Sequence, residues 1–461
     1  MKPKRQNDLG KDPLGPLLLR LAVPAITAQL VNALYNIVDR MYIGHIQEVG
    51  DLALTGLGVA FPVLMFISAL SALAGMGGGS RAAIRMGAGD EEGANAILGG
   101  CTALLVLVSI VVTVVFQLLR EPMLYAFGAS GNTIGYASGY LKIYLWGTIA
   151  VQLSLGLNNF ITTQGFSTTS MLTVVIGAVC NIVLDPIFIF GLDLGVQGAA
   201  LATILSQAVS AVWVLAFLTG RKSRLKIRRR HLRLDPKVLL PVAAIGVSRF
   251  VMPTTESLVN IALNSSLKHY GSDTFVGAMT LASSVMQVLT MPFMGLSQGA
   301  QPIVGYNYGA GQLDRVKRTF RLLFFSSLCF SCAACAALEL FPGLFVSLFN
   351  DKPELVEIAV WALHIYAAGM FMLGVQFSCQ QTFVALGQTR VSLFLALLRK
   401  VILLIPLILL LPRFLSDQVF AVFLAEPVAD ILAATTTGAI FFWRLPRILE
   451  KRRLELEHRP I

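Results

Sequence analysis

The sequence predicts an all-helical integral membrane protein with twelve transmembrane helices in two similar six-helix bundles. Of its 461 residues, 56% are hydrophobic and only 13% are charged, with a mean hydropathy of +0.73. Soluble domains carry about 25% charged residues, roughly twice this share. Apolar runs of about 20 residues, long enough to cross a bilayer as helices, recur along the chain. Blocks of the first half also recur in the second half.

The apolar runs predict the twelve helices. In chain order they cover residues 17–43, 53–80, 95–118, 136–158, 168–190, 197–219, 238–267, 275–303, 317–341, 356–381, 391–411 and 418–443. The predicted domains are an N-terminal tail (1–16), an N-lobe of six helices (17–219), a basic linker (220–237), a C-lobe of six helices (238–443) and a C-terminal tail (444–461). An even number of spans per lobe gives both lobes one orientation, so a pseudo-twofold axis would run along the membrane normal.

The repeat is read from short blocks at constant spacing. Gly87-Ala-Gly89 recurs as Gly309-Ala-Gly311, 222 residues further along the chain. Gly147 recurs as Gly369 and Gly165 as Gly387 at the same spacing. A duplicated half in a strongly apolar chain is typical of membrane transporters, in which two similar lobes can rock about a shared cavity.

Basic residues set the predicted orientation. They crowd both termini and the linker 220–237, whereas the loops predicted to lie outside carry only Arg120, Lys268, Lys352 and Arg413. By the positive-inside rule both termini are cytoplasmic, and we expect a multi-pass protein of a bacterial plasma membrane. The net charge of +11 then indicates contact with anionic membrane lipids and no binding of nucleic acid. The polar N-terminus has no signal-peptide cleavage site.

Other chemistry is not indicated. The six cysteines lie within apolar stretches, without the second Cys or His pair of a metal site, and we read them as small hydrophobic residues. We expect no catalytic residues, no bound metal and no cofactor other than a coupling ion. We also expect a monomer.

Three polar residues are predicted at one depth of the N-lobe. Asp39 lies about five residues before the outer end of the first helix at Gly44, and Asp185 about six before the outer end of the fifth at Gly191. Thr203 lies a similar distance inside the sixth helix. An acid in the middle of a spanning helix costs at least ~2.5–3.5 kcal/mol on insertion scales, so it usually faces a cavity and has a function.

Two further features support a site there. Asn181 lies one turn before Asp185 on the same helix face. On the first helix, the spacing of Gln29, Asn32 and Asn36 continues to Asp39 and predicts one polar stripe. Two prolines can bend these helices, because proline interrupts the backbone hydrogen bonds: Pro24 and Pro186.

The residues alone leave the ion open. A pair of buried carboxyl groups can hold a proton, and the oxygen atoms of Asp, Asn and Thr equally suit Na⁺ at Asp39, Asn181, Asp185 and Thr203. Buried helix-packing groups without a transport role are the plainer alternative.

The second half departs from the first. Alignment of the repeats places Leu267 opposite Asp39 and Leu407 opposite Asp185, so the acidic site has no twin. The C-lobe instead carries Glu256 and Asn260 on its first helix, where an anionic group near the middle of the membrane could attract a cationic substrate. Two more acids, one turn apart on the last helix, are either functional or packing groups: Glu426 and Asp430.

The chain resembles the multidrug and toxic compound extrusion (MATE) family, particularly its bacterial DinF-like branch. The resemblance is carried by Gln29-Leu-Val-Asn-Ala-Leu-Tyr-Asn-Ile-Val-Asp39, Asn181-Ile-Val-Leu-Asp185-Pro-Ile-Phe-Ile-Phe-Gly191 and Gly198-Ala-Ala-Leu-Ala-Thr203, and it covers about residues 15–445. It implies two lobes that form a V around a central cavity. It also implies that the chain is no enzyme but an antiporter, exporting amphipathic organic cations against H⁺ or Na⁺ by alternating access.

The resemblance assigns residues as well. The ion-coupling residues of the family map onto Asp39, Asn181, Asp185 and Thr203, with Tyr35 beside them. Glu256 matches an acid of other branches, but the acid that accompanies it there on the tenth helix is missing, since 356–381 contain only Glu357 near one end.

Two alternatives remain. A flippase for lipid-linked precursors or polysaccharides would need cationic residues around its cavity, whereas the predicted stripes are acidic and amide-rich. A non-transporting membrane receptor would bind a ligand without moving it. The sequence contains no HExxH or Walker motif and no appended soluble domain that would point to an enzyme.

Overall fold

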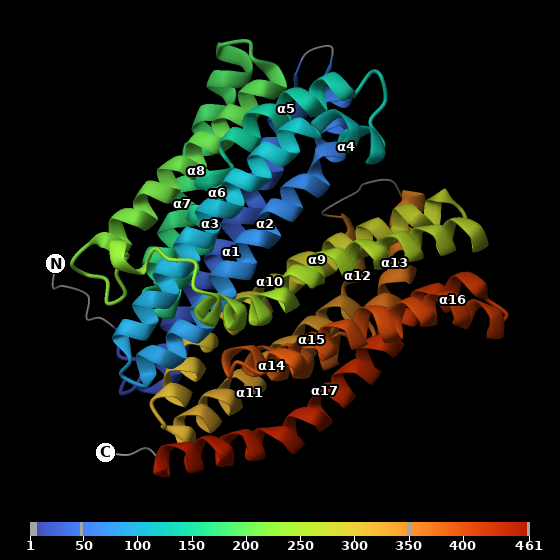
Figure 1. The fold of residues 1–461 in the computed structure, drawn as a ribbon. Coiled ribbons are helices and arrows are strands. Elements are labelled where there is room, and N and C mark those ends of the chain that lie inside the picture. The colour runs from blue at the N-terminus through green and yellow to red at the C-terminus, as the bar shows by residue number, and fades with distance from the viewer. Residues whose placement is uncertain (1–6, 47–48, 348–352, 459–461) are drawn as a thin grey trace. The chain divides into compact units, whose positions relative to one another are not determined.

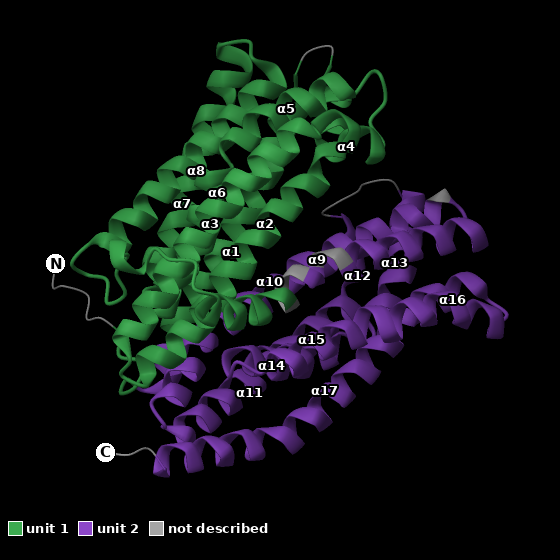
Figure 2. Cartoon of the chain, viewed as in Figure 1, with its two compact units in different colours: residues 1–12, 19–250 green, residues 13–18, 251–461 purple. Residues whose placement is uncertain are grey.

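The structure, a computed structural model, describes residues 7–46, 49–347 and 353–458. Figure 1 shows that these segments form helices joined by short connections, with no strand in the described ranges. The predicted all-helical class is confirmed. The chain divides into two compact units, residues 1–12 with 19–250 and residues 13–18 with 251–461, coloured separately in Figure 2. The division falls inside a helix, at residue 250, and the lobe boundaries predicted at 219 and 238 stay a prediction.

Unit 1 is a bundle of helices in which α2 (Gly50–Gly87) and α8 (Gly195–Thr219) each pack against three other α-helices. Its helices are α1 (Leu14–Gly44) from residue 19 onward, α2 (Gly50–Gly87), α3 (Glu91–Leu118), α4 (Arg120–Ala126), α5 (Ile134–Trp146), α6 (Thr148–Thr163), α7 (Ser167–Pro186), the π-helical η1 (Ile187–Gly191), α8 (Gly195–Thr219), the 3-10 turn η2 (Arg229–His231) and the first part of α9 (Pro236–Tyr270). Helix α8 packs against α5, α6 and α7, and α2 packs against α3, α5 and α6. A buried apolar core between these helices holds Ile43, Ala137 and Ala199.

Unit 2 repeats this plan. It contains the rest of α9, then α10 (Asp273–Gly309), α11 (Leu313–Leu340), α12 (Pro342–Ser347), α13 (Pro353–Ala367), the 3-10 turn η3 (Met370–Met372), α14 (Leu373–Ala385), α15 (Thr389–Leu397), the π-helical η4 (Leu398–Leu404), α16 (Ile405–Phe414) and α17 (Gln418–Glu457). Helix α17 packs against α13, α14, α16 and η4.

Nine helices of the described residues are long and apolar enough to cross a membrane. A tenth span is gained if α13 and the segment Met370–Ala385, which meet at a bend of 43°, count as one. The predicted helix 136–158 differs, because the structure divides it into α5 and α6. Twelve spans are consistent with this arrangement, and that number stays a prediction.

The repeated glycines have a physical role at helix ends. Gly89 and Gly311 directly follow the C-terminal caps of α2 and α10, and both have a φ of +75°. Gly165 and Gly387 follow the caps of α6 and α14 with φ values of +87° and +72°. Residues with a side chain rarely adopt this left-handed conformation, which terminates a helix. The two halves therefore end equivalent helices in the same way.

Another repeated pair marks the two broken helices. Gly147 separates α5 from α6, and a Cβ there would lie 2.3 Å from Cγ2 of Ile204 on α8. Gly369 lies between α13 and η3, directly before η3, and a Cβ there would lie 2.8 Å from Cα of Pro427 on α17. Each break thus lets α8 or α17 pass close to the backbone. Helix α8 carries Thr203, and helix α17 carries Glu426 and Asp430.

The basic loop between α8 and α9 is docked on unit 1. The buried Gln164 side chain accepts hydrogen bonds at its Oε1 from the Ser223 hydroxyl (3.0 Å) and from the backbone N–H groups of Arg224 (2.8 Å) and Leu225 (3.0 Å). Nearby, Glu92 on α3 forms an ion pair of 2.6 Å with Arg230. The loop is therefore held in a defined conformation and is more than a tether.

Candidate functional site

The local structure around Asp185 follows from its neighbour Pro186. Proline has no N–H to donate to the carbonyl of Ile182, four residues earlier, so the regular hydrogen-bonding pattern cannot continue. Helix α7 ends at Pro186 and runs on as the π-helical turn η1. Such wider turns occur frequently at functional sites. The proline predicted to bend this helix is where its geometry changes.

Asp39, Asp185, Asn181 and Thr203 come together in unit 1. All four side chains are buried, with Asp185 fully inaccessible. The Asn181 amide donates to Oδ1 of Asp185 at 3.1 Å and approaches the Thr203 hydroxyl at 3.5 Å. The two carboxyl groups, from α1 and α7, are close enough to interact directly. Helices α1, α7 and α8 thus deliver these side chains to one point.

Three oxygen atoms of this cluster have no hydrogen-bond partner among the described residues. They are Oδ1 of Asp39, Oδ2 of Asp185 and Oδ1 of Asn181. A buried acceptor left unpaired costs about 1–3 kcal/mol. Two carboxylates in contact also repel each other unless a proton or a cation lies between them. The arrangement is therefore suited to take up one positive charge, through oxygen atoms only.

Hydroxyl groups and a cation surround the acidic pair. Tyr35 on α1 lies near both carboxyl groups, and the buried Tyr140 of α5 lies near Asp39 and Thr203. The guanidinium of Arg40, the next residue after Asp39, lies over the Phe61 ring at 5.3 Å from its centroid. The positive charge of Arg40 also acts on the adjacent Asp39, whereas Asp185 interacts with Asp39 and Asn181.

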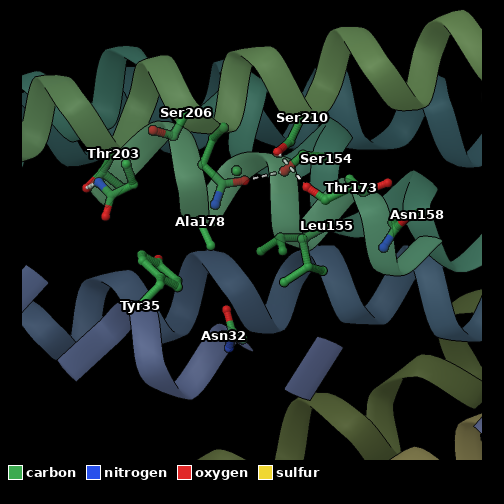
Figure 3. A pocket seen from close by; sticks show the side chains of 14 residues that line it. Asn32, Tyr35, Ser154, Leu155, Asn158, Thr173, Ala178, Thr203, Ser206 and Ser210 are labelled. Carbon is green, nitrogen blue, oxygen red and sulfur yellow. Dashed lines mark hydrogen bonds between the residues drawn. The ribbon is translucent and has the colours of Figure 1, made fainter. Parts of the chain in front are cut away.

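A cavity of about 40 Å³ adjoins the cluster. Figure 3 shows polar side chains of α1, α6, α7 and α8 around it, with Tyr35 and Asn32 on the α1 side. Its lining includes Asn32, Tyr35, Asn158, Asn181, Thr203, Ser206, Gln207 and Ser210. A water needs about 10–15 Å³ of such space, so the cavity can hold a few water molecules beside Asn181 and Thr203. These waters would give an ion a polar route to the acids.

The polar stripe of the first helix divides between two environments. Asn32 lines the cavity and Asp39 is buried in the acidic cluster. Asn36 is exposed, and its amide donates to the carbonyl of Asn32 at 2.6 Å. Gln29 is half-buried one turn before Asn32. Of the three amide residues predicted to bind substrate here, the structure brings Asn32 next to the predicted ion-coupling residues.

Unit 2 has apolar residues at the repeat-related positions. Leu267, aligned with Asp39, is fully buried in the core, and Leu407, aligned with Asp185, packs against that core. The two remaining residues predicted to bind substrate, Glu256 and Asn260, lie on α9 one turn apart and are exposed. At the repeat-related positions, which the structure describes, the acidic site of unit 1 therefore has no counterpart.

Unit 2 instead contains an ionic cluster whose acids on α17 are buried. Nε of Arg399 lies 2.5 Å from Oδ1 of Asp430, and Nη2 of Arg399 lies 3.4 Å from Oε1 of Glu426. Nζ of Lys400 lies 3.3 Å from Oε1 of Glu426 and 3.3 Å from Oε2 of Glu256. The side chains of Glu426 and Asp430 are 4% and 2% exposed, so both are paired buried acids. The cluster joins η4, α17 and α9.

Sequence reasoning missed Arg399 and Lys400. Both lie inside the predicted apolar span 391–411. A signal was present, because a charge in a spanning helix is costly unless it has a partner, and these two cations are opposite in sign to the two acids of the last helix. Pairing buried charges of opposite sign before assigning roles would have found the cluster.

Comparison with known families adds independent information. A sequence model of the MatE family matches residues 24–187 and 250–410, one segment in each half of the chain. The multidrug export protein MepA of Staphylococcus haemolyticus is 25% identical over 418 residues, which cover 90% of this chain and 91% of that protein. MepA of Staphylococcus aureus is also 25% identical, over 439 residues that cover 94% and 95% of the two chains.

Solved structures have the same fold. A structure described as the outward-facing conformation of a multidrug resistance MATE family transporter has a TM-score of 0.89 at 23% identity, covering 97% of this chain and 100% of that chain. A crystal structure of MATE in a bent conformation has a TM-score of 0.91, with the same identity and coverage. The helical arrangement described above is thus shared along nearly the whole chain.

Proposed function

Because the chain belongs to the MatE family, we propose that it is a secondary active antiporter that exports amphipathic, cationic drugs or metabolites in exchange for H⁺ or Na⁺. The family predicted from the sequence is confirmed, and the chain is a multi-pass membrane protein. Its relatives are named as multidrug export proteins, which supports transport and not catalysis. The DinF-like branch stays a prediction.

The observation that carries the proposal is the buried acidic pair of unit 1. Asp39 and Asp185 each have one oxygen atom without a partner among the described residues, and Asn181 adds a third. A proton would give the pair its missing donor, and a Na⁺ ion would find a set of oxygen ligands in the same place. Uptake and release of either ion at this point would couple an ion gradient to the conformational cycle.

The energetics follow from charge balance. Exchange of one monovalent ion for one monovalent organic cation moves no net charge, so the concentration gradient of the ion drives it. A tenfold ion gradient supplies about 1.4 kcal/mol and supports about a tenfold substrate gradient. In this proposal the ion is bound by the ion-coupling residues Asp39, Asn181, Asp185, Thr203 and Tyr35.

The substrate-binding residues in the proposal are Gln29, Asn32, Asn36, Glu256 and Asn260. We also propose that the protein works as a monomer in a bacterial plasma membrane with both termini in the cytoplasm. The basic loop supports this orientation, because positive residues favour the cytoplasmic side.

One observation supports the flippase alternative, and another argues against it. Arg399 and Lys400 are buried cations of the kind that would meet a pyrophosphate. They face three carboxylates, however, so the cluster carries one formal negative charge when every group is ionised. An excess of acid favours cationic substrates over anionic lipid-linked precursors. The receptor alternative has no supporting observation.

The test is uptake of ethidium, a fluorescent organic cation, into inside-out proteoliposomes, with H⁺ and Na⁺ gradients imposed separately. We expect accumulation under one of the two gradients and its loss in Asp39→Asn and Asp185→Asn. Asp193→Asn, which changes an exposed acid of the same unit, is the matched control and should transport normally. Full accumulation by the Asp39→Asn/Asp185→Asn double variant would refute the coupling role, and no accumulation by correctly inserted wild type would refute cation antiport.

A further inference from the structure

We propose that the Lys400 ammonium group pairs with Glu256 while no substrate is bound. A cationic substrate that binds Glu256 displaces this ammonium group, which then pairs with Glu426 alone. This inference rests on the proposed export of organic cations, and it names the residue that sets the affinity of unit 2 for them. It concerns a side chain inside a predicted apolar span to which the sequence analysis gave no role.

The geometry places Lys400 between two acids. Its Nζ lies 3.3 Å from each carboxylate oxygen of Glu256 and 3.3 Å from Oε1 of Glu426. The lysine side chain is 13% exposed. An ammonium group has three donors on a flexible stem, so it can shift between neighbouring acceptors without a change in the backbone.

The two acids differ in access. Glu256 is 53% exposed and can be reached by a ligand, whereas Glu426 is 4% exposed. Oε1 of Glu426 already receives Arg399 and Lys400, but Oε2 is buried with no partner in the described part of the chain. A buried, unpaired carboxylate oxygen is an acceptor that gains by a new donor. Glu426 is therefore prepared to hold the ammonium group once Glu256 is taken.

The charge balance supports an exchange and not a permanent pair. Two cations face three carboxylates, and Arg399 is committed to Asp430 and Glu426. Lys400 therefore forms ion pairs with both Glu426 and Glu256 and neutralises neither of them fully. One further positive charge would neutralise the cluster. A monovalent organic cation that contacts Glu256 supplies that charge at the exposed side.

The π-helical turn η4 explains why both cations can act here. Arg399 and Lys400 are consecutive residues of η4, which packs against α17, the helix that carries Glu426 and Asp430. In a regular α-helix consecutive side chains point about 100° apart, and a wider turn changes this spacing. Both side chains reach the acids of α17, and Lys400 also reaches α9.

The proposal is tested by ethidium binding to the purified full-length protein in nanodiscs, followed by fluorescence titration. Lys400→Met removes the competing charge and is expected to tighten binding about fivefold, the factor that corresponds to an ion pair of about 1 kcal/mol. Glu426→Gln is expected to weaken binding, because the lysine then has a poorer alternative to Glu256. Lys317→Met, which removes an exposed positive charge of α11, should leave binding unchanged.

The double variant Lys400→Met/Glu426→Gln controls for misfolding of Lys400→Met, in which Glu426 has lost one of its two cationic partners. It removes one buried charge of each sign, and it should bind ethidium as tightly as Lys400→Met because the competitor is absent from both. An uncharged analogue with the same ring system should bind all variants equally. This readout separates removal of a charge from a gain of apolar surface.

Weaker or unchanged ethidium binding in both Lys400 variants would overturn the inference, as would equal tightening for the uncharged analogue. Unchanged binding in Glu426→Gln would contradict the movement of the lysine. In each of these cases the wild type still binds and exports the cation, so the proposed function stands. If the wild type neither binds nor exports organic cations, the proposed function fails and this inference fails with it.

Discussion

Replacing Asp185 by asparagine should stabilise the protein at the same time as it abolishes coupled transport. In the structure Asn181 donates to Oδ1 of Asp185, while Oδ2 of Asp185 and Oδ1 of Asp39 have no partner among the described residues. The amide introduced by Asp185→Asn keeps the first hydrogen bond, because its oxygen can still accept from Asn181. Its NH₂ group takes the place of Oδ2 and can donate to Asp39.

The magnitude follows from these atoms. The substitution removes one unpaired acceptor, satisfies a second and ends the repulsion between two carboxylates. An unpaired buried acceptor costs about 1–3 kcal/mol, and a hydrogen bond to a charged group contributes about 1.5–3 kcal/mol. Because the site relaxes and admits water, we expect a net gain of about 1–3 kcal/mol. At roughly 2 °C per kcal/mol for a chain of this size, the melting temperature rises by about 2–6 °C.

The assay is thermal unfolding of the detergent-purified protein, followed by intrinsic fluorescence, with the uptake assay run on the same preparation. Protonation of one carboxyl group supplies the same missing donor, so the gain of Asp185→Asn over the wild type should shrink at acidic pH. If Na⁺ is the coupling ion, added Na⁺ should shrink it as well. A matched Asp193→Asn variant should melt within about 1 °C of the wild type, since surface substitutions change stability by about 0.5 kcal/mol or less.

A lower melting temperature for Asp185→Asn would refute this reasoning. It would mean that both carboxylates are already satisfied in the folded protein, and that the pair stabilises the helices and does not wait for an ion. A rise in melting temperature with transport retained would also count against the account, because the stability cost of the acidic pair would then serve no coupling.

Two further predictions concern other parts of the molecule. Arg399→Met should destabilise the protein by about 3–5 kcal/mol in thermal unfolding, because it leaves Asp430 and Glu426 buried with less positive charge, whereas the exposed Arg413→Met should change little. Equal effects of the two substitutions would argue against the ionic cluster. Gln164→Ala should speed tryptic cleavage of the loop 220–235 severalfold, because Ser223, Arg224 and Leu225 lose their shared acceptor; unchanged cleavage would mean that other contacts hold the loop.

The fold was largely predictable because its signals are local. Apolar runs mark the helices, and the repeated glycines mark their ends: Gly89 and Gly311 are conspicuous in the sequence, and both adopt the left-handed conformation that ends a helix. The break at Gly147 was not predicted, although its recurrence as Gly369 was visible. A glycine that permits a close approach of α8 cannot be distinguished by sequence from one that merely lines an apolar run, because the approach depends on tertiary packing.

The residues around Asp39 and Asp185 were predictable from sequence, whereas the ionic cluster of unit 2 was not. Asp39, Asp185 and Thr203 could be brought together from sequence, since each lies at a similar distance from a helix end and depth in a membrane follows from that distance. Asn181 follows because it lies one turn before Asp185 on the same helix face. The ionic cluster of unit 2 could not be derived from depth alone. It depends on the π-helical turn η4, which orients Arg399 and Lys400, and the apolar pattern of residues 391–411 does not predict such a turn.

The central claim is that ion and substrate move in opposite directions through one protein. The most direct measurement loads proteoliposomes with ethidium and records the internal pH and Na⁺ concentration as ethidium leaves down its own gradient. The account predicts that ethidium efflux drives one of the two ions inward against its gradient, and that this ion movement disappears in Asp185→Asn. Ethidium efflux at the wild-type rate without movement of either ion would contradict it.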